Sequence, residues 1–196
     1  MSDAFDPVAA FKADLKAHDD ATVLDRHFYS GPSAVLKDAQ VASLRRTIAE
    51  KFKVPMRDVI LVGSAKLGFT MLGKEGRPPF SAFCDESDID IAIISERLYL
   101  HYWKSTFAYW QQSGDWTRIE PFKKYLFRGW LRPDLLPPSP DFPDRQEWWD
   151  FLLGLQTSGT YGPYRIRTGV YFDEHFWESY AKSAFQTCRE IVENPL

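Results

Sequence analysis

Hydrophobic positions recur along the chain with two different periods, which predict helices alternating with short strands. Spacings of three and four residues are typical of amphipathic helices, whereas short runs of β-branched residues are typical of buried strands. Strands are predicted over residues 59–62, 88–94 and 164–172. Helices are predicted over residues 6–16, 32–52, 95–112, 116–130, 145–155 and 174–192. This order indicates a mixed α/β or α+β fold, a small mixed sheet flanked by helices.

Two connections interrupt this pattern. The segment between Ser64 and Asp88 is long and rich in glycine and proline, so residues 69–85 are predicted to form an insert without secondary structure. Such a loop is either functional, as a lid or an acceptor-reading element, or disordered. Residues 133–143 contain five prolines and are predicted to form a surface loop. We expect one domain over residues 1–196.

Composition argues against several classes of protein, namely basic nucleic-acid-binding, membrane-spanning, secreted and disulfide-rich proteins. Of 196 residues, 44% are hydrophobic, and the net charge of −3 gives no overall basic footprint for nucleic acid. The apolar runs are too short for a membrane span, and the acidic N-terminal residues are unlike a secretory signal, so we expect a cytoplasmic protein. Cys84 and Cys188 lie more than 100 residues apart, which excludes a disulfide framework and a cysteine-based zinc site. The four histidines show no metal-ligand spacing.

Aromatic residues are unusually abundant, at 16% of the chain. They favour an aromatic core. The alternative is that some of them form an exposed platform, or an interface in a homo-oligomer or with a partner protein. Residues 118–132 interleave basic and aromatic side chains, which favours an amphipathic helix with a solvated face over a nucleic-acid surface.

The chemically informative strand begins Ser87-Asp88-Ile89-Asp90-Ile91. Side chains alternate across a sheet, so Asp88 and Asp90 share one face, with Cα atoms about 7 Å apart. Two carboxylates at that distance repel each other unless a cation lies between them. Mg²⁺ takes carboxylate oxygens together with substrate phosphates. Solvated acids at the start of a strand are the alternative.

A second segment, Gly63-Ser64-Ala65-Lys66-Leu67-Gly68, follows directly on the first strand. Gly63 permits a tight turn, and Ser64 offers a hydroxyl and an N–H to phosphate oxygens. Lys66 adds a positive charge to the predicted nucleotide-binding turn. The segment lacks both the P-loop ending and the dinucleotide fingerprint.

Together these segments resemble the nucleotidyltransferase superfamily with the DNA polymerase β-like fold, and in particular its minimal members from toxin–antitoxin pairs. The matching positions are Gly63, Ser64, Gly68, Ser87, Asp88 and Asp90. The resemblance implies that Asp88 and Asp90 are catalytic and hold two Mg²⁺ ions, and that Ser64 holds the phosphates of a nucleoside triphosphate such as ATP. It implies transfer of a nucleoside monophosphate to an acceptor, which is an RNA, a protein or a small molecule.

One departure from the family pattern favours an alternative function. The family places a third carboxylate on a later strand, but residues 164–172 carry Arg165 and Arg167 instead. Asp173, Asp150 and Glu147 are the candidates for that third acid. Without one, a catalytically weak or inactive module that binds nucleotide or a partner, in a toxin–antitoxin or antiviral defence system, is the rival interpretation.

Overall fold

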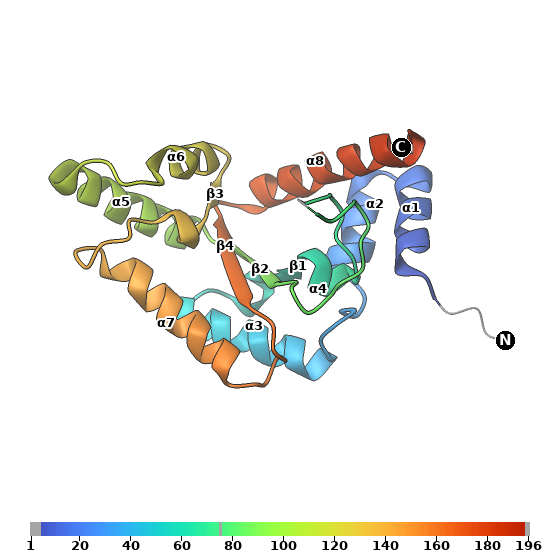
Figure 1. Cartoon of the computed structure of the whole chain (residues 1–196), viewed down its shortest axis with the longest axis horizontal. Helices are drawn as coiled ribbons and strands as arrows, with labels where there is room; N and C mark the ends of the chain where they lie inside the picture. Colours follow the sequence, from blue (N-terminus) through green and yellow to red (C-terminus); the bar gives the residue numbers. More distant parts are fainter. Residues whose placement is uncertain (1–4, 75, 195–196) are drawn as a thin grey trace.

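A four-stranded mixed sheet runs through the centre of the molecule (Figure 1). The structure is a computed structural model that describes residues 5–74 and 76–194. The strands are β1 (Val59–Val62), β2 (Ile89–Ile94), β3 (Trp130–Leu131) and β4 (Ile166–Tyr171). Their order is β1-β2-β4-β3; β2 is antiparallel to β1 and parallel to β4, and β3 is antiparallel to β4. The predicted α+β class with a small mixed sheet is confirmed.

Helices surround this sheet. They are α1 (Pro7–Ala17), α2 (Asp20–Leu24), α3 (Asp38–Phe52), α4 (Gly63–Leu67), α5 (Glu96–Ser113), α6 (Ile119–Phe127), α7 (Pro143–Thr157) and α8 (Glu174–Glu193). A π-helical turn (Asp25–Tyr29) continues α2, and 3₁₀ turns occupy Met56–Asp58 and Pro133–Leu135. In the described part of the chain, none of these helices combines the length and apolar character that crossing a membrane requires.

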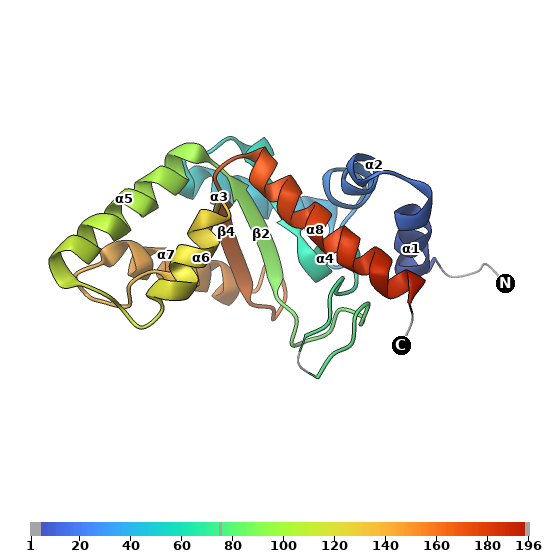
Figure 2. The ribbon, with the colours of Figure 1, turned by 90° about the horizontal axis from the view of Figure 1, so that it is seen from above.

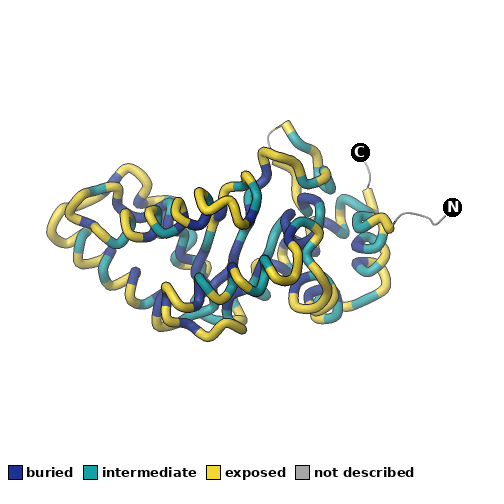
Figure 3. Tube along the Cα trace, turned by 90° about the horizontal axis from the view of Figure 1, so that it is seen from below, coloured by how far each residue is buried: buried dark blue, intermediate teal, exposed yellow. Residues whose placement is uncertain are grey.

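The two faces of the sheet are covered by different helices. One hydrophobic cluster joins Ile89, Ile91 and Ile93 of β2 to apolar residues of α3, α5, α6 and α7. The other joins Ala92 of β2 to residues of α1, α2 and α8. Seen from above, α8 crosses the sheet on the side opposite α7 (Figure 2). Helices α5 and α6 lie at the end of the molecule away from α1. Burial follows the strands and the inner sides of the helices, and the outer turns are exposed (Figure 3).

The third helix begins later than predicted. Residues 32–37 are not helical, and α3 starts at Asp38. Ser33 is the reason, because its hydroxyl donates to the carbonyl of Ala65 (2.7 Å) and accepts from the N–H groups of Val35 and Leu36. These bonds hold the segment in a turn against α4, so its backbone cannot enter the helix.

The region from residue 116 to 143 also differs from the prediction. Helix α6 ends at Phe127, and Trp130 lies in the edge strand β3, paired with Tyr171 of β4. The proline-rich segment is not a surface loop along its whole length, because Leu135, Leu136 and Phe142 are buried in the core. Prolines stiffen this segment, and its apolar side chains fill the space between α6 and α7.

The predicted insert contains no helix or strand in its described residues but follows an ordered path. Within the described residues, isolated bridges pair Phe69 with Ala82 and Lys74 with Arg77. Phe69 is buried beside α1 and α8, so the insert folds back as an irregular hairpin anchored to the core. The described residues of the insert thus lack helices and strands, as predicted, although backbone hydrogen bonds hold them in a hairpin-like path.

Candidate functional site

The predicted acidic pair lies where β2 begins. Ile89 between the two acids is fully buried on the side of α3 and α7. Ala92, which points to the same face as Asp90, is buried on the side of α8. Asp88 and Asp90 therefore lie on the α8 side of the sheet, and the prediction that they share one face is confirmed.

The glycine–serine turn meets this pair. Val62, the last residue of β1, pairs with Asp90, so Gly63 enters α4 directly beside the carboxylate. Gly63 has φ +67°, and a Cβ at this position would lie 2.8 Å from Oδ2 of Asp90. Only glycine fits both the left-handed backbone and this close approach. Ser64 follows and is buried. The structure thus brings together the two segments that carry the predicted chemistry.

Asp90 lies in an environment that disfavours its charge. Burial, and secondly the neighbouring Asp88 carboxylate, raise the pKa of Asp90 to about 6. Lys74, Arg167 and Arg132 act in the opposite direction but do not cancel the effect. A carboxylate held in this way gains strongly from any cation that comes within reach.

Asp88 is held by two arginines of β4. Nε of Arg165 lies 2.9 Å from Oδ1 of Asp88, and Nε of Arg167 lies 2.9 Å from Oδ2. The parallel register places Arg167 directly beside Asp90 and makes this pairing possible. Oδ1 of Asp88 is buried and accepts no hydrogen bond, so the contact to Arg165 is an ion pair without hydrogen-bond alignment. One oxygen of Asp88 is therefore left without a directed donor.

The three candidates for a third carboxylate lie elsewhere. Asp173 is the N-cap of α8 and follows Tyr171, which pairs with Ile94 at the far end of β2. Glu147 and Asp150 belong to α7, which packs on the opposite face of the sheet. None of the three joins the acidic pair, and Arg167 occupies the register position beside Asp90.

Asp88 and Asp90 are the residues that could hold one divalent cation, provided that the arginines of β4 leave Asp88. Within residues 5–74 and 76–194 no group of three or more His, Cys, Asp or Glu side chains is placed to hold a metal ion. Two carboxylates are nevertheless sufficient for Mg²⁺ when phosphate oxygens and water complete its coordination. The unaligned oxygen of Asp88 and the buried charge of Asp90 are consistent with such a site. The second ion that the resemblance implies would need an acid that these residues do not supply.

Lys66 lies apart from the acidic pair. Its ammonium group donates to the carbonyls of Ser30 (2.9 Å), Gly31 (2.6 Å) and Pro32 (3.4 Å), so it ties α4 to the loop before α3. Burial lowers the pKa of Lys66, and the carboxylate that partly offsets this is Asp38. In this structure the predicted nucleotide-binding lysine is thus engaged in a structural contact.

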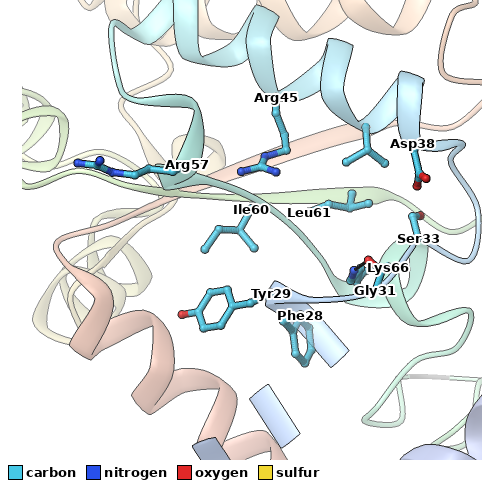
Figure 4. Close-up of a pocket in the computed structure, with 11 residues that line it drawn as sticks. Phe28, Tyr29, Gly31, Ser33, Asp38, Arg45, Arg57, Ile60, Leu61 and Lys66 are labelled. Atoms are coloured by element: carbon cyan, nitrogen blue, oxygen red, sulfur yellow. Dashed lines mark hydrogen bonds between the residues drawn. The ribbon is translucent and has the colours of Figure 1, made fainter. Parts of the chain in front are cut away.

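Lys66 lines a cavity of about 250 Å³ at the free edge of β1 (Figure 4). The cavity lies between α3 and the π-helical turn, and Arg45, Asp38, Tyr29 and Leu61 also face it. Arg45 is committed to backbone carbonyls, since it donates to Val59 (2.7 Å) and Met56 (3.0 Å). These hydrogen bonds satisfy backbone carbonyls at and before the free edge of β1. Neither Asp88 nor Asp90 lines the cavity, so it is a separate site.

An aromatic cluster beside Asp90 was not predicted as part of the site. The ring of Trp130 stacks on Tyr171 with centroids 5.5 Å apart and contacts Tyr180 of α8 at 4.9 Å. Arg132 lies over the Trp130 ring at 5.3 Å. Asp90 contributes to raising the pKa of Tyr171 and of Tyr180, after the larger effect of burial. In the sequence, the feature that could have indicated this cluster is the interleaved basic and aromatic stretch of residues 118–132. The end of that stretch forms β3 only because it pairs with β4.

The rest of that stretch divides between core and surface. Phe122 is buried, Lys123 pairs with Glu120 (2.9 Å), and Arg118 pairs with Asp134 (3.3 Å). Phe127 is fully solvated at the end of α6. The predicted amphipathic helix with a solvated face describes α6.

Comparison of the chain with protein-family models, with curated proteins and with solved structures finds no match.

Proposed function

We propose that this protein binds a nucleoside triphosphate together with one divalent cation at Asp88 and Asp90, and transfers the nucleoside monophosphate to an acceptor hydroxyl. The observation that carries this proposal is the partly buried carboxylate of Asp90, which lies against Gly63 and beside Asp88. Two acids in this position raise the free energy of the ligand-free protein, and a bound cation relieves that cost. The resemblance to nucleotidyltransferases connects this arrangement to a reaction.

The charges around the pair favour a polyanionic ligand over a bare metal ion. Arg165 and Arg167 contact Asp88, and Lys74 and Arg132 act on Asp90. Arg132 is itself paired with Asp134, but Arg165, Arg167 and Lys74 still outnumber the two acids. A cation bound alone would therefore face excess positive charge. A triphosphate that arrives with its cation balances both signs, and guanidinium groups match phosphate oxygens in geometry.

In the proposed reaction the acceptor hydroxyl attacks the α-phosphorus. A new P–O bond forms, the bond from the α-phosphorus to the oxygen that bridges to the β-phosphate breaks, and pyrophosphate leaves with that electron pair. The hydroxyl proton passes to water. A bound Mg²⁺ would neutralise charge on the phosphates and lower the barrier to attack. The arginines beside Asp88 would hold the leaving phosphates, and Gly63 leaves room for the Asp90 carboxylate.

A second candidate is a module that binds nucleotide without turnover. The observation in its favour is Arg167, which stands in register with Asp90 where the family pattern expects an acid. Such a module would sense nucleotide or bind a partner, as in a toxin–antitoxin or defence system. Both candidates share the binding site and differ only in transfer.

Two measurements distinguish the candidates. Calorimetric titration with a non-hydrolysable triphosphate analogue, with and without Mg²⁺, tests the shared site. We expect binding that requires Asp90 and is lost in Asp90→Asn, whereas Asp150→Asn on the opposite face behaves as the wild type. Release of pyrophosphate from each nucleoside triphosphate, assayed with RNA, protein and small-molecule acceptors, then tests transfer. Binding without pyrophosphate release supports the second candidate, and absence of binding refutes both.

A further inference from the structure

The ion pairs of Asp88 conflict with the cation that the proposed function requires. Both arginine contacts, at 2.9 Å each, use the carboxylate oxygens that a divalent ion would need. A divalent cation at Asp88 would also lie next to two guanidinium groups, and like charges at such distances repel. Asp88 therefore cannot serve the arginines and a metal ion at the same time.

The arginines are the partners that are free to move. The side chains of Arg165 and Arg167 are 60% and 51% exposed, whereas that of Asp88 is only 10% exposed. Long exposed side chains change rotamer at little cost, because water solvates the guanidinium in its new position. The backbone is fixed, since the N–H of Ile89 donates to the carbonyl of Arg165 (2.8 Å). Only the side chains of Arg165 and Arg167 need to rearrange.

Phosphate offers these arginines a better partner than Asp88. A guanidinium binds phosphate oxygens through parallel hydrogen bonds, and such charge-assisted pairs are stronger than a contact without alignment. The pair between Arg165 and Oδ1 of Asp88 lacks this alignment. A polyphosphate above β4 would carry enough charge to engage both arginines at once.

We propose that Arg165 and Arg167 form a polyphosphate-controlled latch on Asp88. In the ligand-free protein they occupy the carboxylate and exclude divalent cations; a polyphosphate group draws them away and opens Asp88 to the cation. Anion and cation then bind with positive coupling, so each raises the affinity of the site for the other. This inference rests on the proposed function for its ligand class, but it concerns binding and holds whether or not transfer follows.

The test measures the two ligands separately, because a divalent cation and a polyphosphate also associate in solution. Mn²⁺ binding is followed by electron paramagnetic resonance without any phosphate. The wild type is expected to bind Mn²⁺ weakly, and the double variant Arg165→Gln/Arg167→Gln about tenfold or more tightly, a factor typical of coupled sites. Adding Asp88→Asn to the double variant is expected to abolish the gain.

Inorganic triphosphate without metal is titrated by calorimetry as the second probe. Here the wild type is expected to bind and the double variant to lose about tenfold or more in affinity. Arg128→Gln, at an exposed arginine outside the site, is the matched control and is expected to leave both ligands unchanged. Circular dichroism verifies folding, and Arg165→Gln alone replaces the double variant if the latter is unfolded.

The outcomes are separable. Equal Mn²⁺ affinity in wild type and double variant overturns the latch, because the arginines then do not compete for Asp88. Unchanged triphosphate affinity in the double variant overturns the assignment of polyphosphate as the releasing ligand. If both binding results appear and no pyrophosphate is released from any triphosphate, the latch stands and the transfer activity fails.

Discussion

Replacing Asp90 by asparagine is expected to stabilise the ligand-free protein at neutral and alkaline pH. The carboxylate is partly buried and lies beside Asp88, and in the folded protein desolvation and this neighbouring charge raise its pKa to about 6. The ordinary value of 3.8 applies to the unfolded chain. Asparagine has a similar shape and carries no charge, so the variant removes the electrostatic cost and keeps the packing against Gly63.

The magnitude follows from the difference between the two pKa values. Each pKa unit corresponds to about 1.4 kcal/mol, so the charged Asp90 costs about 3 kcal/mol at pH 8. Because the folded pKa is the higher one, this cost is absent below the unfolded value of 3.8, develops as pH rises from there to the folded value of about 6, and is constant above it. The advantage of the variant should therefore fall to about half at pH 5.

Urea unfolding at pH 5, 6, 7 and 8 measures this directly. At pH 8 the variant should gain about 3 kcal/mol in the free energy of unfolding, or about 6–12 °C in Tm for a chain of this length. Asp88→Asn is the comparison, because it removes the repulsion but also two ion pairs, and a smaller change is expected. A variant at Asp90 that is no more stable than the wild type at pH 8, or whose gain is independent of pH, would refute the reasoning.

Three further predictions concern single positions. Gly63→Ala should lower the free energy of unfolding by about 2 kcal/mol or more, because alanine at positive φ is strained and its Cβ would meet Asp90. Urea unfolding tests this, and an unchanged midpoint contradicts it. Lys66→Met should cost about 1–3 kcal/mol, because three backbone carbonyls lose their donor; an unaltered Tm would mean that the contact contributes nothing. A maleimide should label Cys84, whose exposed thiol has its pKa lowered by a hydrogen bond with a neighbouring serine, and should spare Cys188, whose pKa burial raises to about 11. Mass spectrometry of the labelled peptides decides, and equal labelling of both thiols contradicts the assignment.

The elements that were predicted correctly depend on local patterns. The alternation in residues 88–94 is a property of neighbouring side chains alone. It predicts that Asp88 and Asp90 share one face without any knowledge of the partner strands. Helix α5 begins where Ser95 accepts from the N–H of Leu98, which is a cap readable from the sequence. Such features need no information from distant parts of the chain.

The elements that were missed depend on distant partners. Strand β3 is two residues long and exists because Trp130 and Leu131 pair with β4, about 40 residues later. The late start of α3 depends on the bond from Ser33 to Ala65, and the burial of Leu135 depends on the space left between helices. No local period in the sequence encodes these contacts.

The same division applies to the candidate site. The alternation of Arg165 and Arg167 on one face was predicted, but their pairing with Asp88 requires the parallel register of β2 and β4. Lys66 was assigned to the nucleotide-binding turn because it is close in sequence, and the first turn of α4 directs it to the loop before α3 instead. Proximity along the chain was a poor guide to which side of a helix a residue faces.

Among residues 5–74 and 76–194 no group of three acids surrounds a cation site, and this has a consequence for the proton of the acceptor. A carboxylate that coordinates a cation is a weak base, so Asp88 and Asp90 cannot both hold the metal and accept that proton. The four histidines lie elsewhere: His18 and His27 beside Asp14, His101 beside Asp144, and His175 at a surface pocket with Asp173. With the described part of the chain offering no such base, we expect the proton to leave to water or to a base on the acceptor. Above pH 7, where Asp90 is already charged and can hold the cation, the transfer rate should continue to rise with pH, and a constant rate there would contradict this route for the proton.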